Sequence, residues 1–210
     1  MLKKIVFLIV FSIGVFIGIA QTAAVTSNGD EVVLYNDGTW KFTSRLDSST
    51  KKIDTNKTVF LKNNDATFLL KSSIATVGVN LNPKKWSFSK SGTNPEAEYS
   101  LQLKGEDAFG MLIVERTEIP MENLSNIALE NARKAAPDIK IVEQQYRIVN
   151  GTKVLCLQMN GTIQGIKATF FGYYFSFEKG SIQFVTYTSQ NLFKNYKSLM
   201  EELLNGFVVL

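Results

Sequence analysis

Residues 139–159 read IKIVEQQYRIVNGTKVLCLQM. β-branched and other apolar residues are concentrated on both sides of Asn150-Gly151, a dipeptide that is typical of a two-residue turn between antiparallel strands. The segment therefore predicts a β-hairpin with strands over 139–149 and 153–159. Because an isolated two-stranded hairpin is marginally stable at best, further strands must come from the flanking sequence.

The sequence that follows predicts a continuation of this sheet. Asn160-Gly161 is expected to be another turn, and the run 163–177 contains six aromatic residues and is typical of one long strand. Lys179-Gly180 is expected to turn the chain into a strand over 181–188. Tight turns of this kind join strands that run antiparallel.

The sequence before the hairpin adds more strands. Short strands are expected over 68–71 and 77–80. Alternation of apolar and polar residues predicts a pair over 97–104 and 109–118, joined by a turn at 105–107.

Two segments have the spacing of apolar side chains that is typical of an amphipathic helix. The first lies between Pro120 and Pro137, which are expected to begin and end it. The second runs from about Asn191 to Asn205, and Gly206 is expected to end it before an extended piece at the C-terminus. These elements predict an α+β domain over residues 58–210, in which an antiparallel sheet is flanked by two amphipathic helices.

Residues 24–43 are expected to form a small N-terminal β-meander. Turn signals at 28–29 and 36–38 enclose one strand-like run, and a second run follows at 39–43. The next stretch, 44–57, has few apolar residues and is expected to be a polar linker.

The first twenty residues have the composition of an export signal. Lys3 and Lys4 precede an uncharged apolar run, and Gly18 and Ala20 are small residues suited to a cleavage site. We therefore expect residues 1–20 to be a signal peptide and the mature protein to be periplasmic or extracellular, without a membrane span. An uncleaved membrane anchor is the alternative. No Cys follows the run, so a lipoprotein is not expected.

The residue inventory removes most catalytic chemistry. The chain has no His, which excludes Ser-His and Cys-His sites and His-ligated metals, and its single Cys excludes thiolate zinc clusters, CxxC redox pairs and internal disulfides. Cys156 lies in an apolar run and is expected to be a buried small hydrophobe. Phosphate-binding glycine motifs and calcium-binding acidic loops are also missing from the sequence. We therefore predict that the protein is not an enzyme and uses no metal or cofactor.

The charge balance does not indicate nucleic-acid binding. Without Lys3 and Lys4 the chain has 21 basic and 19 acidic residues. No run of Lys and Arg with interleaved aromatic residues could neutralise several phosphates along one face. Nucleic acid is therefore not an expected partner.

Six landmarks follow one another in a characteristic order. They are a Pro-to-Trp turn at 83–86, an Ile-Pro helix start at 119–125, the Asn-Gly hairpin at 148–154, the long aromatic strand, a Phe-Val-Thr-Tyr strand at 184–187, and a C-terminal helix that ends near Phe207. This order resembles the PsbP-like family, which includes PsbP and exported bacterial proteins of the DcrB type, over residues 65–210. The resemblance implies an α/β/α sandwich that binds other proteins or supports assemblies, without catalytic residues. Residues 28–42 also resemble an N-terminal module of uncharacterised exported bacterial proteins.

The aromatic strands carry the candidate binding residues. We expect Tyr173, Tyr174, Phe175 and Tyr187 either to fill the core or to form one row of a binding groove. The leading hypothesis is an exported module that acts without catalysis, through contacts with another envelope protein. The alternative is a binder of small molecules or lipids that uses the aromatic-rich sheet, and an apolar cavity of about 300 Å³ or more beneath the aromatic strand would favour it. A hydrolase with an unrecognised carboxylate site is a weaker third hypothesis.

Overall fold

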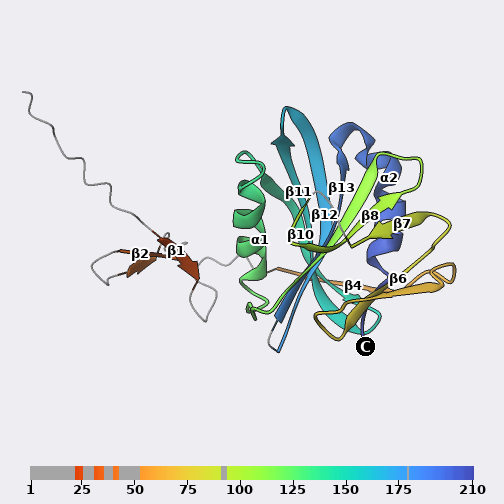
Figure 1. Cartoon of the computed structure of the whole chain (residues 1–210), viewed down its shortest axis with the longest axis horizontal. Helices are drawn as coiled ribbons and strands as arrows, with labels where there is room; N and C mark the ends of the chain where they lie inside the picture. The colour runs from red at the N-terminus through yellow and green to blue at the C-terminus, as the bar shows by residue number, and fades with distance from the viewer. Residues whose placement is uncertain (1–21, 26–30, 36–39, 43–52, 91–93, 179) are drawn as a thin grey trace, which may run out of the picture.

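The largest element of the fold is an eight-stranded sheet with the strand order β4-β10-β11-β12-β13-β9-β8-β7 (Figure 1). The computed structural model describes residues 22–25, 31–35, 40–42, 53–90, 94–178 and 180–210. Neighbouring strands of the sheet run antiparallel, except for β4 and β10, which are parallel. The strands are β4 (Thr55–Phe60), β7 (Trp86–Ser89), β8 (Ala97–Leu103), β9 (Ala108–Glu115), β10 (Lys140–Val149), β11 (Thr152–Ile163), β12 (Ile166–Phe177) and β13 (Gly180–Ser189).

Two helices and two three-stranded sheets complete the described part of the chain. One small sheet has the order β14-β6-β5, and the other has the order β1-β2-β3. The chain is therefore an α+β protein with a large, mostly antiparallel sheet, as the sequence predicts. The elements are α1 (Leu124–Arg133), α2 (Gln190–Leu204), β1 (Thr22–Val25), β2 (Glu31–Leu34), β3 (Trp40–Phe42), β5 (Phe68–Lys71), β6 (Val77–Leu81) and β14 (Phe207–Val209).

The two faces of the large sheet carry separate hydrophobic clusters. Tyr173 packs in one cluster with Met200 of α2 and Val79 of β6. Its neighbour Tyr174 packs in the other cluster with Leu124 of α1. Because successive side chains of a strand point to opposite faces, α1 lies on one face and α2, with the β14-β6-β5 sheet, lies on the other (Figure 1). We call these the α1 face and the α2 face.

The predicted hairpin at Asn150-Gly151 is confirmed. β10 and β11 pair antiparallel, and φ is 46° at Asn150 and 83° at Gly151. Positive φ at both central residues is the requirement of the turn that best fits the twist of a two-residue hairpin.

The predicted turn at Asn160-Gly161 is wrong. β11 continues through both residues, and Gln164 and Gly165 make the turn instead, with φ values of 49° and 82°. A Cβ atom on Gly161 would lie 2.9 Å from the Cβ atom of Ile139, which is closer than real side chains come. Gly161 is therefore present because the chain that follows α1 passes close to β11, and not because the backbone turns there.

Helix α1 is shorter than the interval between the two prolines. The N–H of Asn123 donates to the carbonyl of Pro120 in a turn that precedes the helix, and α1 ends at Arg133, before Pro137. The helix thus lies between the two prolines, but neither proline marks an end of it. The C-terminal helix agrees with the prediction, since α2 spans Gln190–Leu204.

Strand β4 begins within the segment that the sequence predicts to be a linker. The linker prediction covered 44–57, of which 44–52 lies outside the described residues, but β4 already begins at Thr55. The N–H of Tyr146 donates to the carbonyl of Asp54 (2.8 Å), and that of Asn150 donates to the carbonyl of Phe60 (2.9 Å). Backbone groups make this pairing, so a polar sequence suffices for an edge strand.

The N-terminal predictions fall partly outside the described residues. The signal-peptide prediction for 1–20 lies wholly outside them. β1 pairs with β2, and β2 pairs with β3, both antiparallel. Among the described residues, none of the helices combines the length and apolar character needed to cross a membrane.

Candidate functional site

The four candidate aromatic residues do not form one site. Tyr173 and Phe175 belong to the α2 face, and Tyr174 belongs to the α1 face. Tyr187 pairs in register with Phe170, which packs on the α1 face. The structure therefore places them in four surroundings, which are a polar network, the core under α1, a row of aromatic rings and a hollow.

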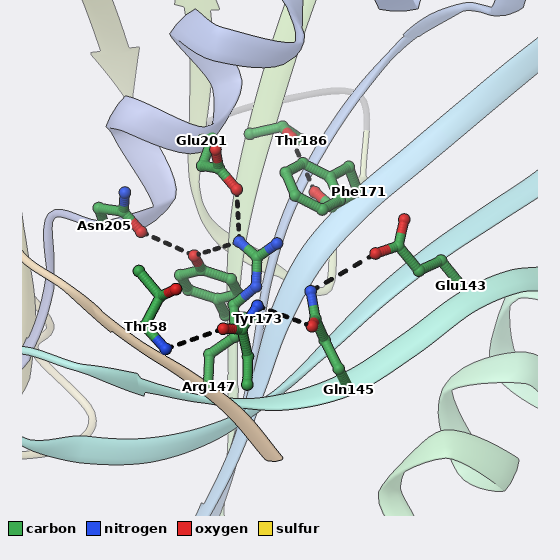
Figure 2. A network of polar contacts seen from close by, with 10 residues as sticks. Thr58, Glu143, Gln145, Arg147, Phe171, Tyr173, Thr186, Glu201 and Asn205 are labelled. Atoms are coloured by element: carbon green, nitrogen blue, oxygen red, sulfur yellow. Dashed lines mark hydrogen bonds and ion pairs between the residues drawn. The ribbon is translucent and has the colours of Figure 1, made fainter. Parts of the chain in front are cut away.

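Tyr173 is buried in a polar network next to α2 (Figure 2). Its hydroxyl accepts a hydrogen bond from Arg147 Nη1 (3.1 Å) and donates one to Asn205 Oδ1 (2.7 Å). Arg147 Nη1 also donates to Glu201 Oε1 (2.5 Å). Since the hydroxyl both accepts and donates a hydrogen bond within the protein, Tyr173 is a structural residue.

Arg147 is a charged side chain in the protein interior, only 5% exposed. Its guanidinium carbon lies 4.3 Å from the ring centroid of Phe60 and 5.6 Å from that of Phe171. The amide of Gln145 lies 2.9 Å from Nη2 and 3.0 Å from Nε, and because a guanidinium only donates, the amide oxygen faces it. Arg147 is therefore held by hydrogen bonds, an ion pair and aromatic faces together.

Burial and neighbouring groups shift the pKa values of Arg147, Tyr173 and Cys156. Burial opposes the charge of Arg147, but the influence of Cys156, Tyr173 and Glu201 raises the pKa of its guanidinium above the usual range. Burial raises the pKa of Tyr173 as well, and it raises the pKa of Cys156 to about 12. The prediction of a buried Cys156 is confirmed, and its thiol stays protonated at neutral pH. The network thus fastens α2 to the sheet.

Tyr174 is a core residue beneath α1. It is 2% exposed and packs in the same cluster as Leu155 and Val185. Burial raises the pKa of its phenol.

Tyr187 lies in a row of partly exposed aromatic rings on the α1 face. Its ring centroid is 5.5 Å from that of Phe109, with the rings stacked, and 5.9 Å from that of Phe170. Met111, on the same face of β9, is also partly exposed. We call Phe109, Tyr187 and Phe170 the aromatic row. It crosses β9, β13 and β12.

Phe175 lines a hollow where β12 ends. The hollow has a volume of about 440 Å³ and is open to the surface. The rings of Phe175 and Phe177 stack with centroids 6.2 Å apart. The other lining residues come from the loop before β6 and the start of β6, from the end of β9, from the residue after β12, and from β14. They are Ile74, Ala75, Thr76, Val77, Glu115, Arg116, Glu178 and Val209.

The loop that walls the hollow is tied to the sheet by Glu98 of β8. Its carboxylate accepts hydrogen bonds from Ser72 Oγ (2.6 Å), from the N–H of Ser73 (2.5 Å) and from Ser73 Oγ (2.7 Å). Three hydrogen bonds to one carboxylate fix the loop, so this wall exists before any ligand arrives.

The sequence predicts Phe175 as a candidate binding residue but not the residues that line the hollow with it. Ile74, Arg116 and Val209 lie far apart in the chain, and no local pattern indicates that they meet. Phe177 belongs to the aromatic run and could have been found from it.

The described residues contain no candidate metal site made of acidic or thiol side chains. Among these residues, no group of three or more His, Cys, Asp or Glu side chains could hold a metal ion. Glu115, one of the carboxylates near the hollow, accepts a hydrogen bond from Gln183 Nε2 (3.3 Å).

Comparison with solved structures identifies the fold. The chain is similar to the cyanobacterial PsbP protein CyanoP from Synechocystis sp. PCC 6803, with a TM-score of 0.51 and 14% identity over 68% of this chain and 92% of that one. A Pseudomonas aeruginosa protein of unknown function gives 0.44 and 12%, over 67% and 95% of the two chains. A Bacteroides thetaiotaomicron protein gives 0.42 and 10%, over 68% and 48%. No family model and no curated protein matches the sequence. The chain therefore has a PsbP-like fold.

Proposed function

We propose that this chain is an exported module without catalytic activity that acts through contacts with another protein of the cell envelope. The observation that carries the proposal is the aromatic row, whose three rings stay partly exposed beside a well-packed core. Aromatic residues and Met are enriched at protein interfaces, and Tyr often dominates the binding energy. The PsbP-like fold supports the same proposal, because the resemblance implies binding and assembly roles.

The aromatic row is suited to a partner that is flat and apolar. Phe109 and Tyr187 present stacked rings, so little side-chain entropy is lost when they are covered. Met111 beside them can adjust its shape to a partner. A contact centred on Tyr187 would thus bury apolar surface with little loss of side-chain conformational entropy.

Site-directed photo-crosslinking in the producing cell tests this proposal. A photoreactive phenylalanine at Tyr187 should give one dominant crosslinked envelope protein. The same probe at Val142, an exposed residue of β10, is the control and should not give that product. The product should also weaken when Phe109→Ala is combined with the probe. Identical products from both positions, or none from Tyr187, would contradict the proposal.

A second candidate function is the binding of a small molecule or lipid. It is favoured by the hollow, whose volume of about 440 Å³ lies within the range of ligand pockets. Two stacked rings, Phe175 and Phe177, supply the apolar surface that such pockets need. Ligand-induced shifts in the NMR spectrum at 74–77 and 175–177 would support this function, and an unchanged spectrum with a panel of amphiphiles would exclude it.

The location outside the cytoplasm rests on residues 1–20. We propose that this segment is a signal peptide and that the mature chain is released into the periplasm or the medium. N-terminal sequencing of the protein from fractionated cells should find a new N-terminus near Gln21. Recovery of an intact N-terminus in the membrane fraction would instead support the uncleaved anchor.

The finer architecture is also a proposal. We propose an α/β/α sandwich whose two helices are amphipathic, preceded by a β-meander over 24–43 that is a separate module. Buried Leu124 and Ile127 on α1, and Met200 and Leu203 on α2, support the helix assignment. Limited proteolysis should cut within 44–52 and leave a folded fragment that begins near β4.

A further inference from the structure

The floor of the hollow is built by packing that leaves two aromatic rings facing open space. A Cβ atom on Gly180 would clash with Phe177 Cζ, so the ring of Phe177 occupies the place of a side chain at position 180. Phe175 stacks on Phe177 and also packs 5.7 Å, centroid to centroid, from Phe207. Both rings are therefore held in position before anything binds.

The walls of the hollow are fixed at both ends. Glu98 holds the loop through Ser72 and Ser73, as described above. The N–H of Leu210 donates to the carbonyl of Thr76 (2.9 Å), and β14 pairs with β6, which places Val209 beside Val77. Ile74 and Val209 are 40% and 43% exposed, so apolar surface is left uncovered at the mouth.

Some of the described charged side chains around the hollow have interaction partners, and one does not. The carboxylate of Glu115 is bound to Gln183, and Glu178 has an interaction of its own. Among the described residues that line the hollow, Arg116 is the charged one with neither a hydrogen bond nor an ion pair. A cation with unused donors beside an apolar floor is complementary to an anionic group on an apolar body.

We propose that the hollow binds an amphipathic molecule with an apolar body and one anionic group, such as an alkyl carboxylate or an anionic lipid. The apolar body lies on Phe175 and Phe177, and the anionic group pairs with Arg116. This inference rests on the second candidate function, small-molecule binding at the hollow. It adds the charge and shape of the ligand, and it identifies Arg116 as the residue that pairs with the anionic group.

A titration with three probes tests the inference on the chain without residues 1–20. Decanoate at low ionic strength should shift the NMR signals of 74–77 and 175–177. Decyltrimethylammonium, which has the same chain and the opposite charge, should bind more weakly. Vesicles with and without phosphatidylglycerol show whether the anionic group belongs to a membrane lipid. Binding of decanoate identifies a free amphiphile, and Arg116-dependent sedimentation with phosphatidylglycerol vesicles alone identifies a lipid; either supports the inference.

Substitutions at Arg116 separate charge recognition from apolar binding. Arg116→Gln should weaken decanoate binding about 2- to 5-fold, because a surface-exposed ion pair contributes modestly. Arg116→Lys should restore most of it, and Arg133→Gln, at a surface arginine of α1, should leave it unchanged. Phe177→Leu should weaken all probes, and urea unfolding shows whether that variant is folded.

The outcomes distinguish the inference from the function on which it rests. Equal binding of decanoate and decyltrimethylammonium, or full decanoate binding by Arg116→Gln, would overturn the ligand class while small-molecule binding at the hollow stands. If no probe moves the signals of the hollow and vesicles do not bind, both are wrong.

Discussion

Arg147 donates a hydrogen bond to the hydroxyl of Tyr173 across the intervening strand β11, with a distance of 3.1 Å from Nη1 to Oη. The same guanidinium binds Glu201 of α2, and the same hydroxyl binds Asn205, which follows α2. One buried cation therefore connects β10, β12 and the C-terminal end of α2. A helix that packs by apolar contacts alone could slide on the sheet, whereas these directional bonds define one position.

Removal of this cation should destabilise the protein strongly. Arg147→Ala leaves the carboxylate of Glu201 without its partner and a cavity beside Phe60, so we expect a loss of about 3 kcal/mol in the free energy of unfolding. Arg147→Met fills more of the space and should cost less. Urea unfolding followed by circular dichroism measures both.

The matched control uses another ion pair of α2. Lys85 Nζ lies 2.8 Å from Glu202 Oε2, but the side chain of Lys85 is 35% exposed. Lys85→Met should therefore cost less than about 1 kcal/mol. Equal losses in Arg147→Ala and Lys85→Met would show that burial does not decide the contribution of Arg147.

Stability should fall in alkaline solution, beginning with Cys156. Burial raises the pKa of this thiol from 9.0 to about 12, so the folded chain keeps a proton that the unfolded chain releases. The contribution is fully present below pH 9.0 and is lost as the pH rises towards 12. The ordinary pKa of Tyr is 10.0. Between pH 9.0 and pH 10.0, the thiol of Cys156 is therefore the main source of the stability loss among these buried groups.

Cys156→Val tests the alkaline effect directly. The variant keeps a small apolar side chain in the core and has nothing to ionise. Its urea midpoint should change less between pH 9.0 and pH 10.0 than that of the unsubstituted chain. If the urea midpoints of the two proteins change equally with pH, the alkaline loss of stability comes from other groups.

Gly161→Ala should destabilise the protein although the backbone conformation suits alanine. The new methyl group would meet Cβ of Ile139 at 2.9 Å and Cβ of Ala136 at 3.1 Å. Overpacking of this kind costs about 1–3 kcal/mol. Gly110→Ala is the control in another strand, because its Cβ would meet only ordinary contacts of 3.5 Å or more. Thermal unfolding of both variants should show a clearly larger decrease in Tm for Gly161→Ala.

Glu98→Ala should loosen the loop that walls the hollow. The N–H of Ser73 would lose its acceptor, so its hydrogen exchange should become much faster. Glu96→Ala, two residues earlier and exposed, should leave this exchange rate unchanged. Slow exchange at Ser73 in Glu98→Ala would mean that the loop is held by other contacts.

The sequence by itself determined the elements that depend on local chemistry. Asn150-Gly151 specifies its turn because both residues tolerate positive φ, and the apolar spacing of 190–204 specifies a helix wherever it packs. The order of these elements was enough to indicate the PsbP-like fold. Only the tertiary structure decided the role of Gly161. The second Asn-Gly dipeptide, Asn160-Gly161, lies within strand β11, where Ile139 packs closely against its glycine.

The candidate sites depended on the tertiary structure even more. Neighbouring aromatic residues look alike in sequence, but strand geometry sends Tyr173 to the polar network and Tyr174 to the core under α1. Arg147 is an ordinary strand arginine until α2 covers it with Glu201. The hollow joins Ile74, Arg116, Phe177 and Val209 from four distant segments. Contacts between distant segments are set by how the sheets and helices pack, and no local pattern in the sequence records them.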